Sequence, residues 1–391
     1  MAGIKDKAAI VGIGATEFSK DSGRSELQLA VEATLAALAD AGIDPSDVDG
    51  LTTFTFDNVY EQELFRNIGG KDLKYFTRIG SGGGAACAPL MQAAMAVATD
   101  VADVVICYRA LNERSEYRFG APNFGAANGQ MPVSCALLFA YHAFSGIFTA
   151  ADCLAVAMRR YMHETGATSD DFANYAIAMR RHAATNPNAF FYQRPITRDE
   201  YHNSRMIADP FRLYDCCQES DGAVAIVVTS AERAAHQRQK PVLIRAGAQG
   251  SPQGTMCMTN YYGADITLHD ESAAAARQLY AASRLGPKDI QAAMFYDHFG
   301  PTVLPMLEAY GFCAYGEAKD FIKNGNIEIG GALPVNTHGG QLGEAYMHGF
   351  NGIAEAVRQL RGTSVNQVEK VHNVLVTAGS GVPTSAVILG T

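Results

Sequence analysis

The sequence has no tryptophan and no long hydrophobic run, and its charge balance is acidic. Its 391 residues carry 31 Lys+Arg against 40 Asp+Glu, a formal net charge of −9. No stretch approaches the ~18 uninterrupted apolar residues of a membrane helix. Residues 1–7 are polar and charged and lead directly into a strand-like run, unlike a signal peptide. We therefore expect a cytoplasmic protein without membrane insertion. We also expect no nucleic-acid binding, because an acidic chain repels phosphates.

The eight cysteines lack the spacing of a metal site or a disulfide framework. They lie at positions 87, 107, 135, 153, 216, 217, 257 and 313, with no CxxC pair and no Cys/His cluster. Zinc sites usually show such pairs, and disulfide frameworks belong to oxidising compartments. We expect no metal, no resident cofactor and mostly buried, reduced thiols. Whether one thiol is a nucleophile is open at this point.

An internal duplication organises the chain. Helical periodicity over 26–41 is followed by a glycine stop, a Pro-initiated turn and a strand, and the same succession recurs from 272 to 294. A glycine-rich turn then opens a helix through 99 and a strand at 103–108 in the first copy. In the second copy, glycines precede a single helix through about 360 and strands at 371–377 and 385–389. Short β-branched runs alternating with helices predict an α/β protein with helices on its sheets.

The region between the copies differs from them in composition, with Ala-, Met- and Arg-rich helices and polar loops. We interpret it as an insertion in the first copy. The predicted domains are an N-terminal half at 1–240, which includes an inserted loop domain at about 112–215, and a C-terminal half at 241–391.

Five segments in order resemble the thiolase superfamily, specifically its sterol-carrier-protein-X-type thiolase-like members. They are 8–18 (AAIVGIGATEF), 207–217 (IADPFRLYDCC), 220–223 (SDGA), 333–340 (LPVNTHGG) and 356–362 (AVRQLRG). Each is weak alone, but together they span the chain. The resemblance implies a thiolase fold, in which two similar βαβαβαββ halves form a five-layered α-β-α-β-α core with an inserted loop domain. It also implies a homodimer and an acyl-CoA thioester as substrate.

A thiolase uses a cysteine thiolate at a helix N-terminus, where the helix dipole lowers the pKa of the thiol. Counting back without gaps from the strand at 103–105 places this position on Gly83, with Cys87 one helical turn further in. A shift of four residues would bring in Cys87, but it would lengthen a helix whose end matches well. We therefore expect Gly83 at the nucleophile position. Cys87 is then a small buried residue, as free cysteines commonly are.

The other thiolase groups are replaced as well. The histidine of the GHPxG motif falls on Tyr346, and the Asn or His that begins the NEAF or HDCF motif falls on Tyr296. The second cysteine falls on Thr377 or Ala378. Tyrosine can act as general acid or base, although ionising it at pH 7 costs about 4 kcal/mol. Either tyrosine alone would equally well be a core aromatic, but the two together favour a catalytic role.

Three histidines and a glycine turn complete the candidate site. His298, His338 and His348 lie in motif loops and could relay protons near pH 7, or could simply orient those loops. The resemblance implies an oxyanion hole made by backbone N–H groups of the turn at 379–381. The catalytic candidates are Tyr296, Tyr346, His348 and His298; the substrate-binding candidates are Gly379, Gly381, His338 and Cys87.

Thioester activation without a nucleophilic cysteine suits carbon–carbon cleavage by a retro-aldol reaction. A tertiary β-hydroxyl cannot be oxidised to a ketone, so thiolysis cannot cleave such a substrate. In the retro-aldol reaction a base takes the hydroxyl proton, the Cα–Cβ bond breaks, and an acid protonates the thioester enolate. We expect Tyr346 to be the base and Tyr296 its partner in proton transfer, or the reverse.

The chain resembles most the lipid-transfer-protein-type steroid side-chain aldolases. This implies cleavage of a 17-hydroxy steroid C22-CoA thioester to a 17-ketosteroid and propionyl-CoA. It also implies a complex with a small protein that has an OB-fold and often a zinc ribbon. Two alternatives stay open: an acyl-transferring thiolase that uses Cys87, and a non-catalytic acyl-CoA- or lipid-binding scaffold.

Overall fold

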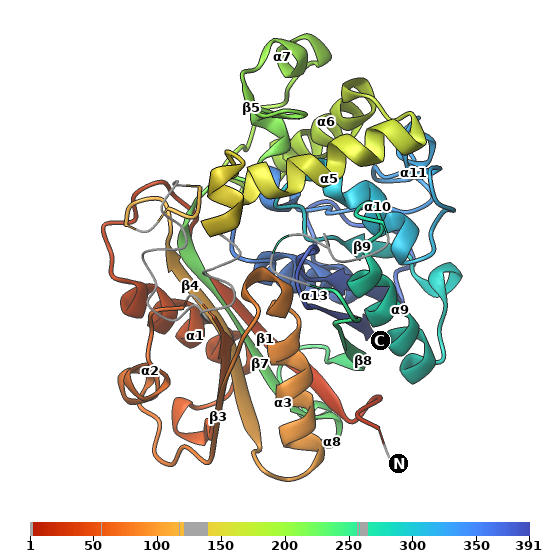
Figure 1. Ribbon diagram of the computed structural model, residues 1–391. Helices are drawn as coiled ribbons and strands as arrows, with labels where there is room; N and C mark the ends of the chain where they lie inside the picture. The colour runs from red at the N-terminus through yellow and green to blue at the C-terminus, as the bar shows by residue number, and fades with distance from the viewer. Residues whose placement is uncertain (1–2, 56, 117, 121–139, 256–257, 259–264) are drawn as a thin grey trace.

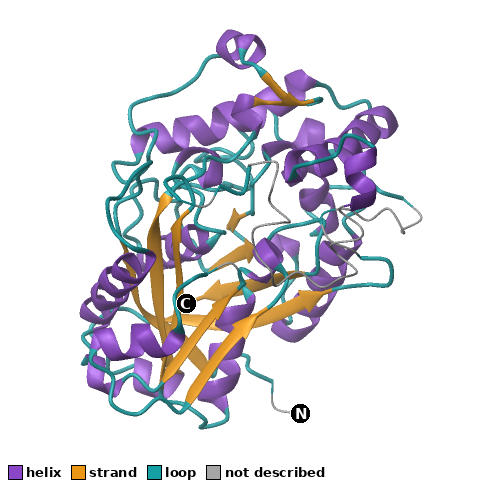
Figure 2. Ribbon diagram, turned by 60° about the vertical axis from the view of Figure 1, so that its left-hand side comes forward, coloured by secondary structure: helices purple, strands orange, loops and turns teal. Residues whose placement is uncertain are grey.

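The computed structural model describes residues 3–55, 57–116, 118–120, 140–255, 258 and 265–391. A mixed sheet with the strand order β3-β2-β4-β7-β1-β8-β11-β10-β9 runs through the protein (Figures 1 and 2). Its strands are β1 (Ala8–Ala15), β2 (Gly50–Phe54), β3 (Tyr75–Ile79), β4 (Val104–Asn112), β7 (Asp221–Ser230), β8 (Val242–Gly250), β9 (Ala292–Met294), β10 (Asn373–Thr377) and β11 (Thr384–Gly390).

The strand order is mirrored about the middle of the sheet. In the first half β2 is parallel to β4 and β4 is antiparallel to β7. In the second half β9 is parallel to β10 and β10 is antiparallel to β11. The halves join where β1 pairs antiparallel with β8, through Ala9 with Leu243 and Ile10 with Val242. The duplication of sequence is thus a duplication of strand pairing. The predicted domain limits stay predictions.

Helices cover both outer faces of the sheet and fill the space between its halves (Figures 1 and 2). The outer helix α1 packs on β1, β4 and β7, and the outer helix α9 packs on β8 and β11. Between the halves, α3 and α13 share one apolar cluster with strands of both halves. This succession is the predicted five-layered α-β-α-β-α core. The helices are α1 (Glu26–Ala41), α2 (Glu61–Ile68), α3 (Ala88–Ala98), α5 (Ala150–Thr165), α6 (Ser169–Thr185), α7 (Arg198–Asn203), α8 (Ala231–Ala234), α9 (Asp270–Ser283), α10 (Val303–Ala309), α11 (Ala318–Phe321), α12 (Gly340–Gly343) and α13 (Phe350–Arg361).

Local signals set the ends of α1, and two glycines let it approach the sheet. The hydroxyl of the N-cap residue Ser25 accepts a hydrogen bond from a backbone amide of the first turn, and the helix ends at Gly42, where φ is +71°. A Cβ at Gly12 or Gly14 of β1 would lie 2.2 Å from a backbone oxygen of α1. The absence of side chains there brings helix and strand into direct contact.

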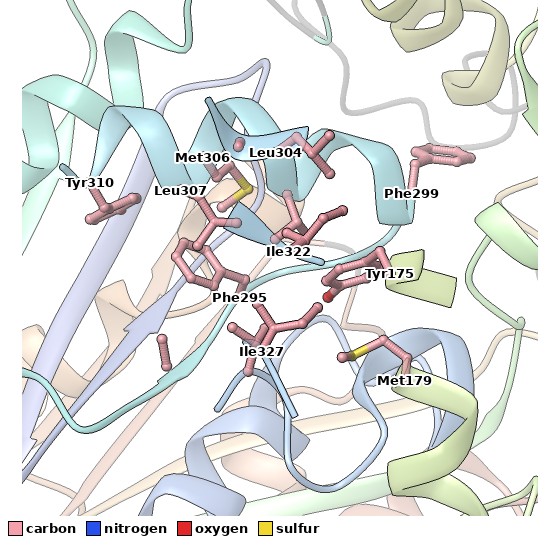
Figure 3. Close-up of a cluster of buried hydrophobic side chains, with 14 of the residues drawn as sticks. Tyr175, Met179, Phe295, Phe299, Leu304, Met306, Leu307, Tyr310, Ile322 and Ile327 are labelled. Atoms are coloured by element: carbon pink, nitrogen blue, oxygen red, sulfur yellow. The ribbon is translucent and has the colours of Figure 1, made fainter. Parts of the chain in front are cut away.

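The region expected as an insertion packs its helices on the second half. Helices α5, α6 and α7 each begin with a capping box, and the hairpin β5 (Met206–Ala208) and β6 (Phe211–Arg212) lies beside them. The apolar faces of α5 and α6 join α9 and α10 in one core cluster, part of which Figure 3 shows. The insertion therefore shares a core with the second half. Within the described ranges, no helix combines the length and apolar character needed to cross a membrane.

The prediction of a single helix after the glycines at 339–340 is wrong. The structure has the short helix α12, a non-helical loop at 344–349, and then α13. His348 and Gly349 take φ values of +48° and +84°, which an α-helix cannot include. Glu344 follows directly after the end of α12. The loop carries Tyr346 and His348, so this departure from periodicity shapes the candidate site.

Candidate active site

The two predicted tyrosines meet in the structure. Tyr296 follows β9, Tyr346 lies in the loop between α12 and α13, and their hydroxyl oxygens are 2.9 Å apart. The backbone amide of Tyr296 donates to the hydroxyl of Thr377, 3.0 Å away, and the amide of Tyr346 to that of Ser220, 3.4 Å away. Both side chains are buried, with 2% and 8% of their surface exposed. The structure thus joins the residues expected as acid and base.

Burial keeps both phenols neutral. It raises the pKa of Tyr346 well above its usual value, and the nearby groups Tyr296, Cys217 and Glu113 add to the effect. Burial likewise raises the pKa of Tyr296, against the smaller opposing effects of the Tyr346 hydrogen bond and of Arg109. Neither residue is a tyrosinate at pH 7. The pair is therefore suited to passing protons through neutral hydroxyls.

Gly83 lies directly against the hydroxyl of Tyr296. It belongs to a short 3-10 turn at Gly82–Ala85, just before α3. A Cβ at Gly83 would be 2.2 Å from the Tyr296 oxygen and 2.7 Å from its Cζ, closer than such atoms approach. The space that a nucleophilic side chain at position 83 would need is therefore filled by the phenol of Tyr296. A cysteine at this position and a tyrosine at 296 exclude each other.

Cys87 has the environment of a core residue. Its thiol donates to the carbonyl of Val376, 3.6 Å away, and its side chain is 1% exposed within the central apolar cluster. Burial raises the pKa of the thiol far above its usual value, which disfavours a thiolate. This favours the interpretation of Cys87 as a small packed side chain. Its assignment as a substrate contact stays a prediction. Free thiols are found at Cys87, Cys107, Cys216, Cys217 and Cys313, and Cys135 and Cys257 lie outside the described residues.

The two amides expected to bind the thioester oxygen are engaged within the protein. The amide of Gly379 donates to the carbonyl of Gly83 at 3.0 Å, and that of Gly381 to the carboxylate of Glu271 at 2.9 Å. The predicted oxyanion role requires these bonds to open. In the same turn, the buried hydroxyl of Ser380 has no hydrogen-bond partner within the described part of the chain. The hydroxyl of Ser380 is thus a further donor in this turn, in addition to the backbone N–H groups expected from the sequence.

Two of the three predicted histidines adjoin the tyrosines. The His298 ring lies 5.1 Å from that of Tyr296, and the His348 ring 4.8 Å from that of Tyr346. Burial lowers the pKa of His298 to about 3, and burial together with Arg109 lowers that of His348 well below its usual value. Both are neutral at pH 7. The half-buried ring of Phe119 stacks on His348, with 5.0 Å between ring centroids.

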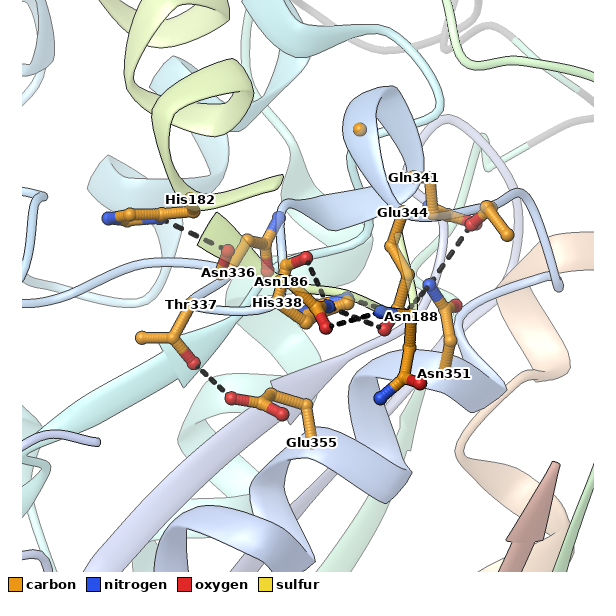
Figure 4. A network of polar contacts seen from close by, with 12 residues as sticks. His182, Asn186, Asn188, Asn336, Thr337, His338, Gln341, Glu344, Asn351 and Glu355 are labelled. Carbon is orange, nitrogen blue, oxygen red and sulfur yellow. Dashed lines mark hydrogen bonds and ion pairs between the residues drawn. The ribbon is translucent and has the colours of Figure 1, made fainter. Parts of the chain in front are cut away.

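His338 belongs to a separate polar network, shown in Figure 4. Its Nε2 lies 3.9 Å from a carboxylate oxygen of Glu344, which also accepts from Asn186 and Asn351. Burial lowers the pKa of His338 to about 3. The network links the loop at 344–349 to the end of α6 and to α13. Contact between His338 and substrate stays a prediction.

Sequence reasoning missed two buried charged residues of β4 and its end. Arg109 is 0% exposed, and its Nη2 lies 2.5 Å from Nδ1 of His348. Glu113 is 2% exposed, and one of its carboxyl oxygens has no hydrogen-bond partner in the described ranges. Burial, and then Glu219, raise the pKa of Glu113 well above its usual value. A usable signal was present, because charges interrupt and end an otherwise apolar strand. No group of metal-ligating residues is found among the described positions.

A thiolase-type sheet with a glycine at the expected nucleophile position and a tyrosine packed against that glycine defines a thiolase-like protein. The family model for the thiolase C-terminal domain-like region matches residues 255–391. Over 98% of this chain and 97% of the relative, the sequence is 61% identical to a steroid side-chain-cleaving aldolase of Thermomonospora curvata. It is 57% identical to a 17-hydroxy-3-oxo-4-pregnene-20-carboxyl-CoA lyase of Mycobacterium tuberculosis, over 99% of this chain and all of the relative.

Solved structures agree with the sequence relatives. The Ltp2-ChsH2(DUF35) aldolase matches 100% of this chain and 99% of the matched chain, with a TM-score of 0.94 and 59% identity. Human mitochondrial 3-ketoacyl-CoA thiolase, at 14% identity and a TM-score of 0.69, shares the fold. The predicted thiolase fold is thereby confirmed. The chain belongs to the thiolase superfamily, and within it to the steroid side-chain-cleaving aldolases.

Proposed function

We propose that this protein is a carbon–carbon lyase that cleaves a β-hydroxyacyl-CoA by a retro-aldol reaction. Its substrate is a 17-hydroxy steroid C22-CoA thioester, and its products are a 17-ketosteroid and propionyl-CoA. The observation that carries this proposal is the 2.9 Å contact between the hydroxyls of Tyr296 and Tyr346, beside a glycine at the nucleophile position. The aldolase and lyase relatives at 61% and 57% identity support the same reaction.

The contact between the hydroxyls of Tyr296 and Tyr346 allows proton transfer without ionising either phenol. Tyr346 takes the proton of the substrate hydroxyl while its own proton passes to the oxygen of Tyr296. The Cα–Cβ electron pair becomes the enolate, a carbonyl forms at Cβ, and Tyr296 releases its proton to Cα. One proton leaves oxygen and one arrives at carbon, so the relay closes without a free tyrosinate. The cost of ionising a phenol, about 4 kcal/mol even at the reference pKa, is avoided.

The substrate class is tested by product analysis with and without free CoA. Incubation with a 17-hydroxy steroid C22-CoA is expected to release the 17-ketone and propionyl-CoA in equal amounts, with no requirement for added CoA. A requirement for CoA would instead indicate thiolysis. Tight binding of the thioester without turnover, with the partner present, would leave only the scaffold function.

The protein is also proposed to act within a complex. The solved Ltp2-ChsH2(DUF35) aldolase, 59% identical to this chain, carries a DUF35 component in its name, which supports a complex with a DUF35-type partner. We propose that this partner is a small OB-fold protein, often with a zinc ribbon, and that two copies of the present chain form a homodimer. Sedimentation of the chain alone and after mixing with such a partner tests both associations.

Replacing Cys87 by alanine is expected to leave kcat close to that of the wild type. The thiol contacts core residues and a strand carbonyl, so its loss costs about 1 kcal/mol of stability through a small cavity and leaves the tyrosine pair intact. Steady-state turnover and thermal unfolding measure the two effects separately. Loss of activity in a folded Cys87→Ala protein, or rapid inactivation by a thiol-alkylating reagent at this residue, would favour the thiolase alternative.

A further inference from the structure

Arg109 is a cation in the middle of a strand that lies wholly inside the protein. Nη1 donates to the carbonyl of Phe54 at 3.0 Å, and the guanidinium carbon lies 4.3 Å from the centre of the Phe54 ring. Nη1 also lies 3.8 Å from a carboxylate oxygen of Asp57, which is likewise buried. Burying such a charge costs several kcal/mol even when it is paired. Packing alone would be served better by an apolar side chain.

The carboxylate beside Arg109 is held in place by the backbone. Asp57 accepts hydrogen bonds from the amide of Val59 at 2.9 Å and from the amide of Ala110, the residue after Arg109, at 3.1 Å. The hydroxyl of Thr53 lies 3.4 Å away. These contacts fix the carboxylate relative to β4. The guanidinium therefore has one defined orientation, with Nη2 directed to His348.

The contact between Arg109 and His348 determines which ring nitrogen of the histidine carries a proton. A guanidinium has donors only, so Nδ1 of His348 must accept the hydrogen bond from Nη2. A neutral imidazole that accepts at Nδ1 carries its proton on Nε2. The permanent charge of Arg109 also opposes a second proton on the ring. Phe119 on one face and the edge contact with Tyr346 fix the ring plane.

We infer that Arg109 is a positioning residue of this site, which locks His348 as a neutral, Nε2-protonated ring against Tyr346. Asp57 holds the guanidinium in the required orientation. His348 then exchanges no proton during the reaction, and acid–base chemistry is left to the two phenols. The fixed His348 ring packs against the ring of Tyr346 and thereby orients the Tyr346 hydroxyl towards Tyr296. The inference about catalysis depends on the proposed aldolase function, whereas the tautomer of the resting protein does not.

The tautomer is measured on the full chain labelled with 15N-histidine. Two-bond proton–nitrogen correlations distinguish Nε2–H from Nδ1–H and from the doubly protonated ring, and loss of one signal set in a His348→Asn variant assigns the residue. The expected result is a neutral Nε2–H ring that does not titrate between about pH 5.5 and 8.5. An Nδ1–H tautomer, or titration in this range, would overturn the inference and leave the aldolase proposal standing.

Variants of Arg109 test its effect on turnover. In Arg109→Met, kcat is expected to fall roughly 100-fold with little change in KM, and His348 is expected to lose its single tautomer. Arg109→Lys, which retains a charged donor, is expected to recover part of kcat and the Nε2–H form. The matched control is Arg245→Met, which removes a β8 arginine paired with Asp6, away from the tyrosines. Wild-type kcat in a folded Arg109→Met protein would contradict the inference; if that variant does not fold, the wild-type spectrum decides.

Discussion

Replacing Tyr346 by phenylalanine is expected to abolish turnover, with kcat reduced by roughly 10³-fold or more. The change removes one oxygen atom and thereby both the group that accepts the substrate proton and the partner of the Tyr296 hydroxyl, 2.9 Å away. A lost buried hydrogen bond costs about 1 kcal/mol, so the protein should stay folded. Single-turnover assays with the steroid thioester and thermal unfolding of the same sample separate catalysis from stability.

The chain offers a matched control for the loss of a buried phenol oxygen. Tyr310 is completely buried, and its hydroxyl has no hydrogen-bond partner within the described ranges. Tyr310→Phe should therefore keep full activity and equal or higher stability. Tyr296→Phe should match Tyr346→Phe, and the double variant should be no slower than either, because both residues belong to one relay. Near wild-type turnover in either single variant would refute the relay.

Local sequence signals predicted the bounds of a helix correctly where capping residues determine its ends. The bounds 26–41 of α1 follow from its serine cap and terminal glycine, and the structure has the same bounds. The motif register likewise brought Tyr296 and Tyr346 together across 50 positions of sequence. Register succeeds here because the duplicated fold fixes which strand ends and loops face each other. The fold class and the pairing of the tyrosines were thus predictable from the sequence.

Tertiary contacts explain what the sequence did not predict. Apolar periodicity continues through 344–349, but Glu344 bonds to Asn186 and Asn351 and holds the loop out of a helix. The amides of Gly379 and Gly381 are engaged by partners far away in sequence. Arg109 contacts Phe54 in β2, Asp57 in the loop after β2 and His348 in the loop at 344–349. No window of sequence contains these contacts, so a local pattern can show the charge of Arg109 within an apolar strand but not the partners that it, the loop or the glycine amides find.

Replacing Gly83 by alanine is expected to remove almost all activity through one added methyl group. The new Cβ would lie 2.2 Å from the Tyr296 oxygen, whereas that oxygen now lies 2.9 Å from Tyr346. Tyr296 cannot simply withdraw, because its backbone is bonded to Thr377 and its side chain is fully buried. The phenol must tilt and break the relay, so kcat should fall roughly 100-fold or more. Overpacking should also cost about 1–3 kcal/mol of stability.

The control for Gly83→Ala is Gly80→Ala, because a Cβ at Gly80 meets nothing within 4 Å. Gly80→Ala should leave kcat unchanged, whereas Gly83→Ala with near wild-type kcat would contradict the close packing. In the double variant Gly83→Ala/Tyr296→Phe, loss of the clashing oxygen should restore part of the stability but no activity, a coupling that a double-mutant cycle measures. Gly83→Cys should likewise give no thiolase, because the thiol and the phenol compete for one space. The space beside Gly83 can hold either a nucleophilic side chain or the phenol of Tyr296, and in this protein the phenol occupies it.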